Sequence, residues 1–387
     1  MTRCCLFWVV VLGVAGAWAL AGAPSEAEVQ GLYEGTCKDA QGEAKVEARC
    51  VAMGKNTYKL LIRNGIGVTS TARLEMDGSL AGDAVGFAAK VGDAIWEAKY
   101  AAGAIRGQFG NGGTLELKRV QRVSPTLGAK PPEGAIVLLD GKSFDQIVRA
   151  NGSPWYVGDK TKEGQVVWEM AVRAVAKEPK VWPTKENPLP EGWELLPERR
   201  RVDEVLIIGE DGSIQVPRGG FNSKPQMDGS FKYHVEFCNP LQPEARGQGR
   251  GNSGCYLPNG EEIQVLDSFG MPTYTGGGCG GFYNYKDPDC MAELEYLKGQ
   301  KENKFTLASL PPGEWQTYDI EYRVTKKDGK LVGKPRVTVL HNGIKIHDNF
   351  EPRADAKRGG FHWQDHGNPV RYRNIWVLPL ADKAGEL

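Results

Sequence analysis

Short runs of alternating apolar and polar residues, ended by turn-forming residues, constrain the fold of this chain most strongly. Between residues 29 and 120 every run has the length of a strand and stops at glycine, asparagine or aspartate. The 50 glycines and 23 prolines leave few long helical patterns, and only residues 291–297 indicate a helical turn or two. Period-two alternation between frequent turns is typical of β-strands. The sequence therefore predicts an all-β protein.

The 387 residues exceed the size of one ordinary domain, so two domains are expected. Residues 29–120 form a small β accessory domain, a barrel or sandwich in which no convincing catalytic motif occurs. Residues 121–134 are rich in proline and glycine and predict a stiff linker. Residues 135–380 then form a larger β-sandwich, within which the charged, proline-rich segment 177–201 is expected to be a surface insertion.

The N-terminus has the pattern of an export signal. Arg3 precedes an apolar run from Leu6 to about Ala15, and small residues follow at Ala19, Ala21 and Ala23. Residues 1–23 are therefore predicted to be a cleaved signal peptide, too short in its apolar part to span a bilayer. No other segment is apolar enough for a membrane span. The mature chain is expected to be secreted, or periplasmic within the cell envelope.

Charge and cysteine content limit the partners and the compartment. Lysine plus arginine and aspartate plus glutamate both number 48, which gives no reason to expect a nucleic-acid partner. An even number of cysteines in an exported protein favours disulfides over a metal cluster. Sequence proximity favours Cys37–Cys50, which we predict to be bonded, and Cys279–Cys290. The six cysteines that remain after cleavage are Cys37, Cys50, Cys238, Cys255, Cys279 and Cys290.

Polar side chains interrupt what otherwise has the pattern of a buried strand at residues 262–267. Alternation places Ile263 and Val265 on one face and Glu262 and Gln264 on the other. One face then packs in a core while the other presents a carboxylate beside an amide, which is one way to build a polar binding cleft. An exposed edge strand is the equal alternative. Asp267 would fall on the apolar face unless a β-bulge turns it or the strand has ended.

Four separated pieces of the larger domain resemble one family. They are residues 136–142; residues 251–257 together with 262–268; residues 315–320 together with 336–349; and residues 363–376, whose QDHGNPVRYRNIW stretch is the most specific. In this order they are similar to the 3-keto-disaccharide hydrolase domain family, the 3-keto-glucoside lyase/hydratase type, over roughly residues 132–380. The resemblance implies a concanavalin-like jelly-roll sandwich and action on glycosides whose C3 hydroxyl has been oxidised to a ketone.

A C3 ketone acidifies the C2 proton, so the glycosidic bond can break by elimination at C1. Hydration of the resulting enone gives net hydrolysis. Such a site needs a base, an acid and a partner for the enolate oxygen. Glu262 is the first candidate for base or acid, because a regular strand holds it rigidly. Asp267 is the second carboxylate. Gln264 stands where the similar laminarinase-type strand has its middle acid, which argues against a two-carboxylate retaining mechanism.

Other polar residues near these motifs complete the candidate site. His366 is the third catalytic candidate, as a proton shuttle near neutral pH, although a structural loop histidine is nearly as plausible. We predict that Glu262, Gln264 and Arg371 or Arg373 line one concave cleft, while structural ion pairs of the two arginines with Glu262 or Asp267 are an equal alternative. The predicted substrate-binding residues are Asn252, Ser253, Gln264, Gln364, Arg371 and Arg373.

No tight ligand spacing demands a metal or another cofactor, and a divalent metal bound by Glu262, Asp267 or His366 is left open. The expected partner is a 3-keto sugar or another carbohydrate. The principal hypothesis is an exported enzyme that cleaves 3-keto-glycosides. The alternatives are a non-catalytic carbohydrate-binding protein and an envelope interaction module on the same sandwich. Two titratable groups about one sugar apart would favour the enzyme, and an open aromatic platform without them would favour binding.

Overall fold

The computed structural model describes residues 23–40, 42–67, 71–109, 112–152, 206 and 208–384. Nearly all of the predicted signal peptide and the whole predicted insertion at 177–201 lie outside these residues. The described chain is almost entirely antiparallel β-structure, which confirms the all-β prediction. Its helices are one α-helical turn, α1 (Glu26–Val29), and the 3₁₀ turns η3 (Gly247–Gly249) and η4 (Glu295–Leu297). Within these residues, no helix is long and apolar enough to cross a membrane.

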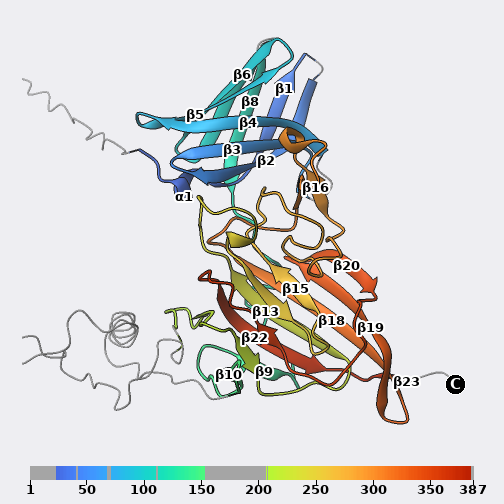
Figure 1. The fold of residues 1–387 in the computed structure, drawn as a ribbon. Helices are drawn as coiled ribbons and strands as arrows, with labels where there is room; N and C mark the ends of the chain where they lie inside the picture. The colour runs from blue at the N-terminus through green and yellow to red at the C-terminus, as the bar shows by residue number, and fades with distance from the viewer. Residues whose placement is uncertain are drawn as a thin grey trace, which may run out of the picture.

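The N-terminal strands close into a barrel in which each strand pairs with the next and β8 returns to β1 (Figure 1). Its interior is filled by alternating apolar side chains such as Tyr33, Val46, Leu60 and Phe87. Closure leaves no unpaired sheet edge. The barrel strands are β1 (Gly31–Asp39), β2 (Gly42–Gly54), β3 (Thr57–Asn64), β4 (Thr71–Ala81), β5 (Ala84–Val91), β6 (Ala94–Ala101), β7 (Ala104–Phe109) and β8 (Gly113–Val120).

The C-terminal part consists of two antiparallel sheets packed face to face. The five-stranded sheet contains, in spatial order, β10 (Ile147–Arg149), β12 (Phe221–Ser223), β21 (His362–Trp363), β14 (Ser253–Tyr256) and β15 (Glu262–Val265). The eight-stranded sheet runs β11 (Ile214–Gln215), β22 (Arg371–Pro379), β13 (Phe231–Cys238), β18 (Trp315–Lys327), β19 (Lys330–His341) and β20 (Ile344–Phe350), with β9 (Ile136–Leu139) on β22 and β23 (Lys383–Ala384) on β18.

One apolar core fills the space between the two sheets. Trp363 stacks on Phe221 within the five-stranded sheet, with ring centroids 4.5 Å apart, and Tyr372 of the other sheet meets Phe221 edge to face. Ile263 and Val265 belong to the same core. Because strand residues alternate between faces, the neighbours of these core residues lie on the outer faces of the sandwich. The face of the five-stranded sheet that is turned away from the core is called the outer face of the five-stranded sheet below.

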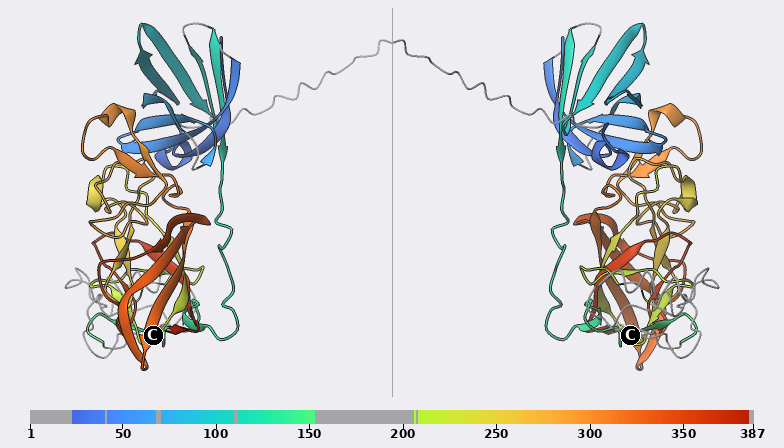
Figure 2. Two further views of the ribbon diagram at one scale, coloured as in Figure 1. Left: turned by 90° about the vertical axis from the view of Figure 1, so that its right-hand side faces the viewer. Right: turned by 90° about the vertical axis from the view of Figure 1, so that its left-hand side faces the viewer.

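The linker lies along the eight-stranded sheet on its way from the barrel to β9 (Figure 2). Ser124 Oγ lies 2.6 Å from Thr317 Oγ1, and the Gly128 amide donates to Glu236 Oε1 over 2.5 Å. Asn374 Nδ2 donates to the Ala129 carbonyl. These polar contacts to β13, β18 and β22 fix the linker on the sandwich.

The barrel also contacts the sandwich directly, through a separate apolar cluster. Val51 and Leu61 of the barrel pack with Phe269 and Phe305, and the short hairpin β16 (Met291–Glu293) and β17 (Lys304–Thr306) approaches β4 (Figure 1). Arg49 is buried in this interface, where it donates to the Leu307 and Ser309 carbonyls. The two domains are therefore joined by an apolar interface as well as by the linker.

The strand register contradicts the predicted Cys37–Cys50 disulfide. On the paired strands β1 and β2, Cys37 lies opposite Ala44 and Cys50 opposite Gly31. Six residue positions along a strand separate the two thiols by about 20 Å, far beyond the reach of a disulfide. Cys279 and Cys290 are buried thiols that contact Tyr318 and Thr306, not each other.

A tight hairpin joins β19 to β20. Strands β19 and β20 flank Asn342 and Gly343, whose φ angles of 52° and 77° are those of a tight hairpin turn.

Candidate functional site

The strand β15 divides its side chains between the core and the outer face. Ile263 and Val265 are fully buried in the core, so Glu262 and Gln264 point to the outer face of the five-stranded sheet. The strand ends at Val265, which decides between the two alternatives for Asp267: it follows the strand and is not turned by a bulge.

Glu262 is a nearly buried carboxyl group whose side chain has one hydrogen bond from the residues that the structure describes. It is 7% exposed, and the Tyr256 hydroxyl donates to Oε2 over 2.8 Å. Burial raises the pKa of Glu262 to about 7, against the smaller lowering effect of the Tyr256 hydrogen bond. The second oxygen, Oε1, makes no hydrogen bond to any residue that the structure describes. A carboxyl group that is half ionised near neutral pH can both take and return a proton.

Gly254 provides the space that this carboxyl group occupies. A Cβ atom on Gly254 would lie 2.0 Å from Glu262 Oε1. Gly254 pairs with Gln264 on β15, and its neighbour Tyr256 pairs with Glu262. The absence of a side chain at one position of β14 therefore sets the orientation of the carboxyl group on the adjacent strand.

Tyr256 connects Glu262 to side chains of β21 and of the loop that follows it. Gln364 Nε2 donates to the Tyr256 hydroxyl oxygen over 3.3 Å, and the His362 ring meets the Tyr256 ring edge to face at 5.2 Å between centroids. Burial, and then the charge of Glu262, raise the pKa of Tyr256, so its hydroxyl stays protonated. The chain Gln364, Tyr256, Glu262 fixes the direction of the carboxyl group.

His362 is held as a neutral ring in this site. Its Nδ1 lies 2.6 Å from Asn222 Oδ1, and because that oxygen only accepts, Nδ1 carries the proton. Burial lowers the pKa of His362.

Gln264 belongs to a group of three side-chain amides, together with Gln248 and Asn252. Gln248 Oε1 accepts from Gln264 Nε2 over 2.8 Å and from Asn252 Nδ2 over 3.0 Å, and Gln248 Nε2 donates to the Gly277 carbonyl. The side-chain oxygens of Asn252 and Gln264 are buried and accept no hydrogen bond within the described chain. Buried acceptors without a donor are costly, so these two oxygens are suited to the hydroxyl groups of a bound ligand.

Ser253 is placed in the core, away from this group. It belongs to the core-facing side of β14, where its hydroxyl accepts from the Tyr372 hydroxyl over 2.8 Å and donates to the Gln364 carbonyl over 2.6 Å. The predicted substrate contact at Ser253 is thus replaced by a bond that ties the two sheets together.

The predicted cleft shared by Glu262 and the two arginines does not form. Tyr372 packs in the core, so Arg371 and Arg373 point from the opposite, outer face of the eight-stranded sheet. There Arg371 pairs with Asp211 at 2.7 Å and Arg373 pairs with Glu236 at 2.7 Å. The two arginines therefore form structural ion pairs, which was the second alternative, but their partners are Asp211 and Glu236.

Asp267 also lies apart from Glu262, at the boundary with the barrel. Its Oδ2 accepts from Arg250 Nε over 2.6 Å and its Oδ1 from the Phe269 amide over 3.2 Å. Arg250 in turn donates to the Ala52 carbonyl of the barrel. One carboxylate oxygen is therefore used in a buried structural ion pair and the other in a hydrogen bond from the backbone.

His366 is exposed on the loop after β21. The preceding Asp365 shapes this loop by accepting hydrogen bonds from the Gly219 and Gly367 amides. No group of three histidine, cysteine, aspartate or glutamate side chains that could hold a metal occurs among the residues with described positions.

The structure thus brings together Glu262, Gln264, Asn252 and Gln364 of the predicted residues, and separates them from Ser253, Asp267, Arg371 and Arg373. The sequence analysis missed Tyr256, His362 and Gln248. Alternation could have found the first two, because Tyr256 follows the core residue Cys255 and His362 precedes the core residue Trp363.

Comparison with protein-family models matches residues 134–378 to the 3-keto-alpha-glucoside-1,2-lyase-like domain. The match covers more than half of the chain, and the chain belongs to this family. The membership agrees with the resemblance inferred from the sequence motifs, and it supports a carbohydrate-active role. No curated protein matches the chain.

Three crystal structures from Parabacteroides distasonis, each named a "putative glycosyl hydrolase", resemble parts of this chain. The first has 25% sequence identity and a TM-score of 0.40, and the match covers 64% of this chain and 85% of that one. The second has 19% identity and a TM-score of 0.31, with coverages of 46% and 91%. The third has 17% identity and a TM-score of 0.34, with coverages of 64% and 95%.

Proposed function

We propose that this protein is an exported enzyme that cleaves 3-keto-glycosides by elimination and hydration, with Glu262 as the group that moves the proton. The observation that carries the proposal is the position of Glu262 on the outer face of the five-stranded sheet. Its carboxyl group is buried, its pKa is near 7 and one of its oxygens has no hydrogen bond within the described chain. Family membership supports the class of substrate. We also propose the concanavalin-like jelly-roll architecture for the two-sheet sandwich.

In the first step, Glu262 Oε1 takes the C2 proton of the 3-keto sugar, and an enolate forms at C3. Negative charge leaves the carboxylate and appears on the C3 oxygen. The Tyr256 hydroxyl, which had donated to the carboxylate, is then able to donate to the enolate oxygen instead. A donor that follows the developing charge stabilises the intermediate.

In the second step, the enolate collapses to an enone and the C1–oxygen bond breaks. Protonated Glu262 returns its proton to the departing glycosidic oxygen, so the aglycone leaves as an alcohol. Water then adds at C1 and a proton returns to C2, which gives the free 3-keto sugar. The unsatisfied oxygens of Asn252 and Gln264 would accept hydrogen bonds from sugar hydroxyls during this sequence. Because Glu262 supplies both proton transfers, neither Asp267 nor His366 has a role in this scheme.

The proposal favours an enzyme over a non-catalytic carbohydrate-binding module on the same sandwich. A binding module has no need for a carboxyl group that titrates near neutral pH. Perturbed pKa values are concentrated at catalytic sites.

The test is the turnover of 3-keto-trehalose and of unoxidised trehalose by the wild type and by Glu262→Gln. General acid or base catalysis contributes about 10²–10⁴-fold, so the variant should lose a factor of this size on 3-keto-trehalose. The wild type should leave trehalose intact and, in deuterated water, place deuterium at C2 of the product.

Two results would refute the elimination mechanism. One is cleavage of trehalose at a comparable rate. The other is product without deuterium at C2, under conditions in which the product itself does not exchange.

A further inference from the structure

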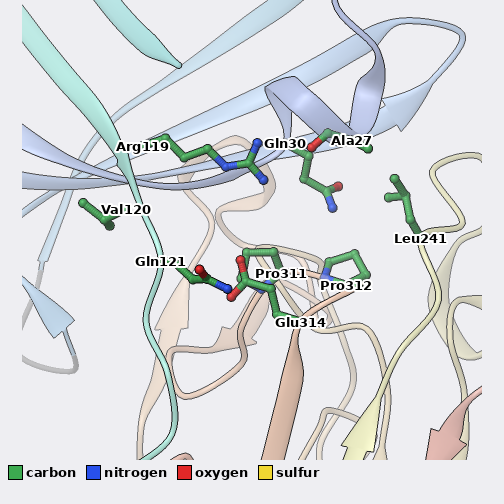
Figure 3. A pocket seen from close by; sticks show the side chains of 10 residues that line it. Ala27, Gln30, Arg119, Val120, Gln121, Leu241, Pro311, Pro312 and Glu314 are labelled. Carbon is green, nitrogen blue, oxygen red and sulfur yellow. Dashed lines mark hydrogen bonds between the residues drawn. The ribbon is translucent and has the colours of Figure 1, made fainter. Parts of the chain in front are cut away.

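A cavity of about 550 Å³ lies between the barrel and the sandwich (Figure 3). None of the residues that line it belongs to the Glu262 site. Its walls come from four segments: α1 with Gln30, the continuous stretch Arg119–Gln121 where β8 passes into the linker, and two sandwich loops that carry Leu241 and Pro311–Glu314. Sites for small molecules typically measure about 300–1,000 Å³, and they are common at domain boundaries. This cavity has the size and the place of such a site.

Glu314 provides a polar atom without a partner at this cavity. Its Oε2 is buried and makes no hydrogen bond with any part of the chain that the structure describes. Burial raises the pKa of Glu314 to about 7, and Arg119 opposes this effect. A buried carboxyl oxygen without a donor is costly for a protein that gains nothing from it.

Arg119 lies across the cavity from Glu314 (Figure 3). Its Nη1 donates to the Ala27 and Glu28 carbonyls, which holds α1 beside β8. Within the described residues, Arg119 and Glu314 form no ion pair. Two opposite charges therefore face the same space with room for a molecule between them.

The lining chemistry fits a neutral polyhydroxylated ligand. Arg119, Gln30 and Gln121 have side-chain N–H donors, Glu314 has an acceptor, and the ionised form of Glu314 balances the charge of Arg119. Each hydroxyl of a sugar both donates and accepts, so it matches such a mixed lining. Leu241, Pro311 and Pro312 offer apolar surface to the C–H face of a sugar ring.

We propose that this cavity is a second saccharide-binding site that holds one or two uncharged sugar units between the two domains. The inference rests on the carbohydrate class that family membership supports, and it is independent of the reaction proposed at Glu262. It gives the barrel a role that its own sequence does not show, because α1 and β8 supply one wall of the site.

The experiment measures binding of radiolabelled trehalose by equilibrium dialysis. Glu314→Ala should weaken binding by about tenfold, the effect of losing one hydrogen bond to a carboxyl group. Ala27→Trp, which fills the cavity mouth from an exposed position, should abolish binding. Both variants should keep their turnover of 3-keto-trehalose. Glu314→Gln keeps a hydrogen-bonding side chain of the same shape and should retain most of the affinity.

Two control variants locate the binding. Glu133→Ala removes an exposed carboxylate of the linker and should change nothing. Gln264→Ala alters the Glu262 site and should leave binding in the cavity intact. Binding that Gln264→Ala removes, and that the two cavity variants leave unchanged, would show that trehalose occupies the Glu262 site instead.

Charged probes test the class of ligand. Glucosamine and glucose 6-phosphate should bind more weakly than trehalose, because the first brings a positive charge and the second about two negative charges to a balanced site. Tighter binding of either one would overturn the assignment to a neutral sugar. Absence of trehalose binding at about 50 mM, well above the dissociation constants of weak specific sites, would overturn the site itself. Neither result would bear on turnover at Glu262, so the two proposals can fail separately.

Discussion

At the scale of the residue, the buried carboxyl group of Glu262 imposes a cost on the fold that its proposed catalytic role would require. Folding raises its pKa from 4.5 to about 7, so between these pH values the folded chain binds more protons than the unfolded chain. Stability therefore falls as the pH rises through this window, and the full penalty is present above about pH 7. A residue kept for catalysis and not for stability is expected to behave in this way.

The first prediction follows from this sign. Glu262→Gln should raise the free energy of unfolding at about pH 8 by up to about 3 kcal/mol, and should leave it unchanged at about pH 4. The measurement is denaturant unfolding of both proteins across this pH range. Glu97→Gln, at an exposed position of β6, is the matched control. Its free energy of unfolding should follow that of the wild type at every pH. A variant that is less stable than the wild type at about pH 8 would show that the carboxylate is stabilised by the fold.

Tyr256 is expected to position Glu262 and to set the pH dependence of the reaction. As a base, Glu262 must be ionised, so kcat/KM should rise with pH and level off above about pH 7. Tyr256→Phe removes the hydrogen bond that lowers the pKa of Glu262 and should move this limb upward by about one pH unit.

The pH–rate profile measures this shift. Tyr283→Phe alters a tyrosine whose hydroxyl contacts Tyr274 and not the carboxyl group, so it should leave the limb in place. If Tyr256→Phe lowers the plateau without moving the limb, Tyr256 does not tune Glu262.

At the scale of the element, β14 and β15 act as a pair. Gly254→Ala should lower kcat/KM by about tenfold or more. The new Cβ atom would lie only 2.0 Å from the present position of Glu262 Oε1, so the carboxyl group would have to move while the rest of β14 stays in register. Gly86→Ala is the control, since a Cβ atom on that β5 strand residue meets nothing within 4 Å. Circular dichroism should show both variants folded. Full activity of Gly254→Ala would mean that the orientation of the carboxyl group does not matter.

The part of this site that the sequence could predict is the face of a strand to which each side chain points, since this follows from alternation along single strands. It correctly gave the opposite faces of Ile263 and Glu262, because a period of two is fixed by backbone geometry. Alternation could not show that Glu262 and Arg371 lie in different sheets. It separates the two faces of a strand, but it does not say which sheet the strand joins. Both residues point outward, and the whole sandwich lies between them.

Long-range pairing explains the other differences. Cys37 and Cys50 are close in sequence, but the turn between β1 and β2 pairs residues that are equally distant from it. The two cysteines are at unequal distances from the turn, so they do not face each other. The partner of Asp267 was equally hidden, because Arg250 reaches it through a loop and not through a repeating pattern.

At the scale of the whole molecule, the interface around Arg49 determines whether the barrel and the sandwich unfold together. Arg49 is 1% exposed, donates to the Ser309 and Leu307 carbonyls, and lies over the rings of Phe269 and Phe305. Burial lowers the pKa of Arg49 to about 10, mainly against the charge of Glu47, which lies 3.6 Å away. The guanidinium thus stays charged at neutral pH and bonds two carbonyls that the apolar interface would otherwise leave without donors.

Arg49→Ala should therefore weaken the attachment of the barrel to the sandwich more than it weakens either domain. Loss of the two charged hydrogen bonds to the Leu307 and Ser309 carbonyls is expected to cost about 3–5 kcal/mol, while Glu47 keeps its ion pair with Arg122. Differential scanning calorimetry should show one transition in the wild type and two in the variant, the first at a lower temperature. Arg106→Ala removes an exposed barrel arginine and should keep the single transition. A single, unshifted transition in Arg49→Ala would mean that the linker contacts alone couple the two domains.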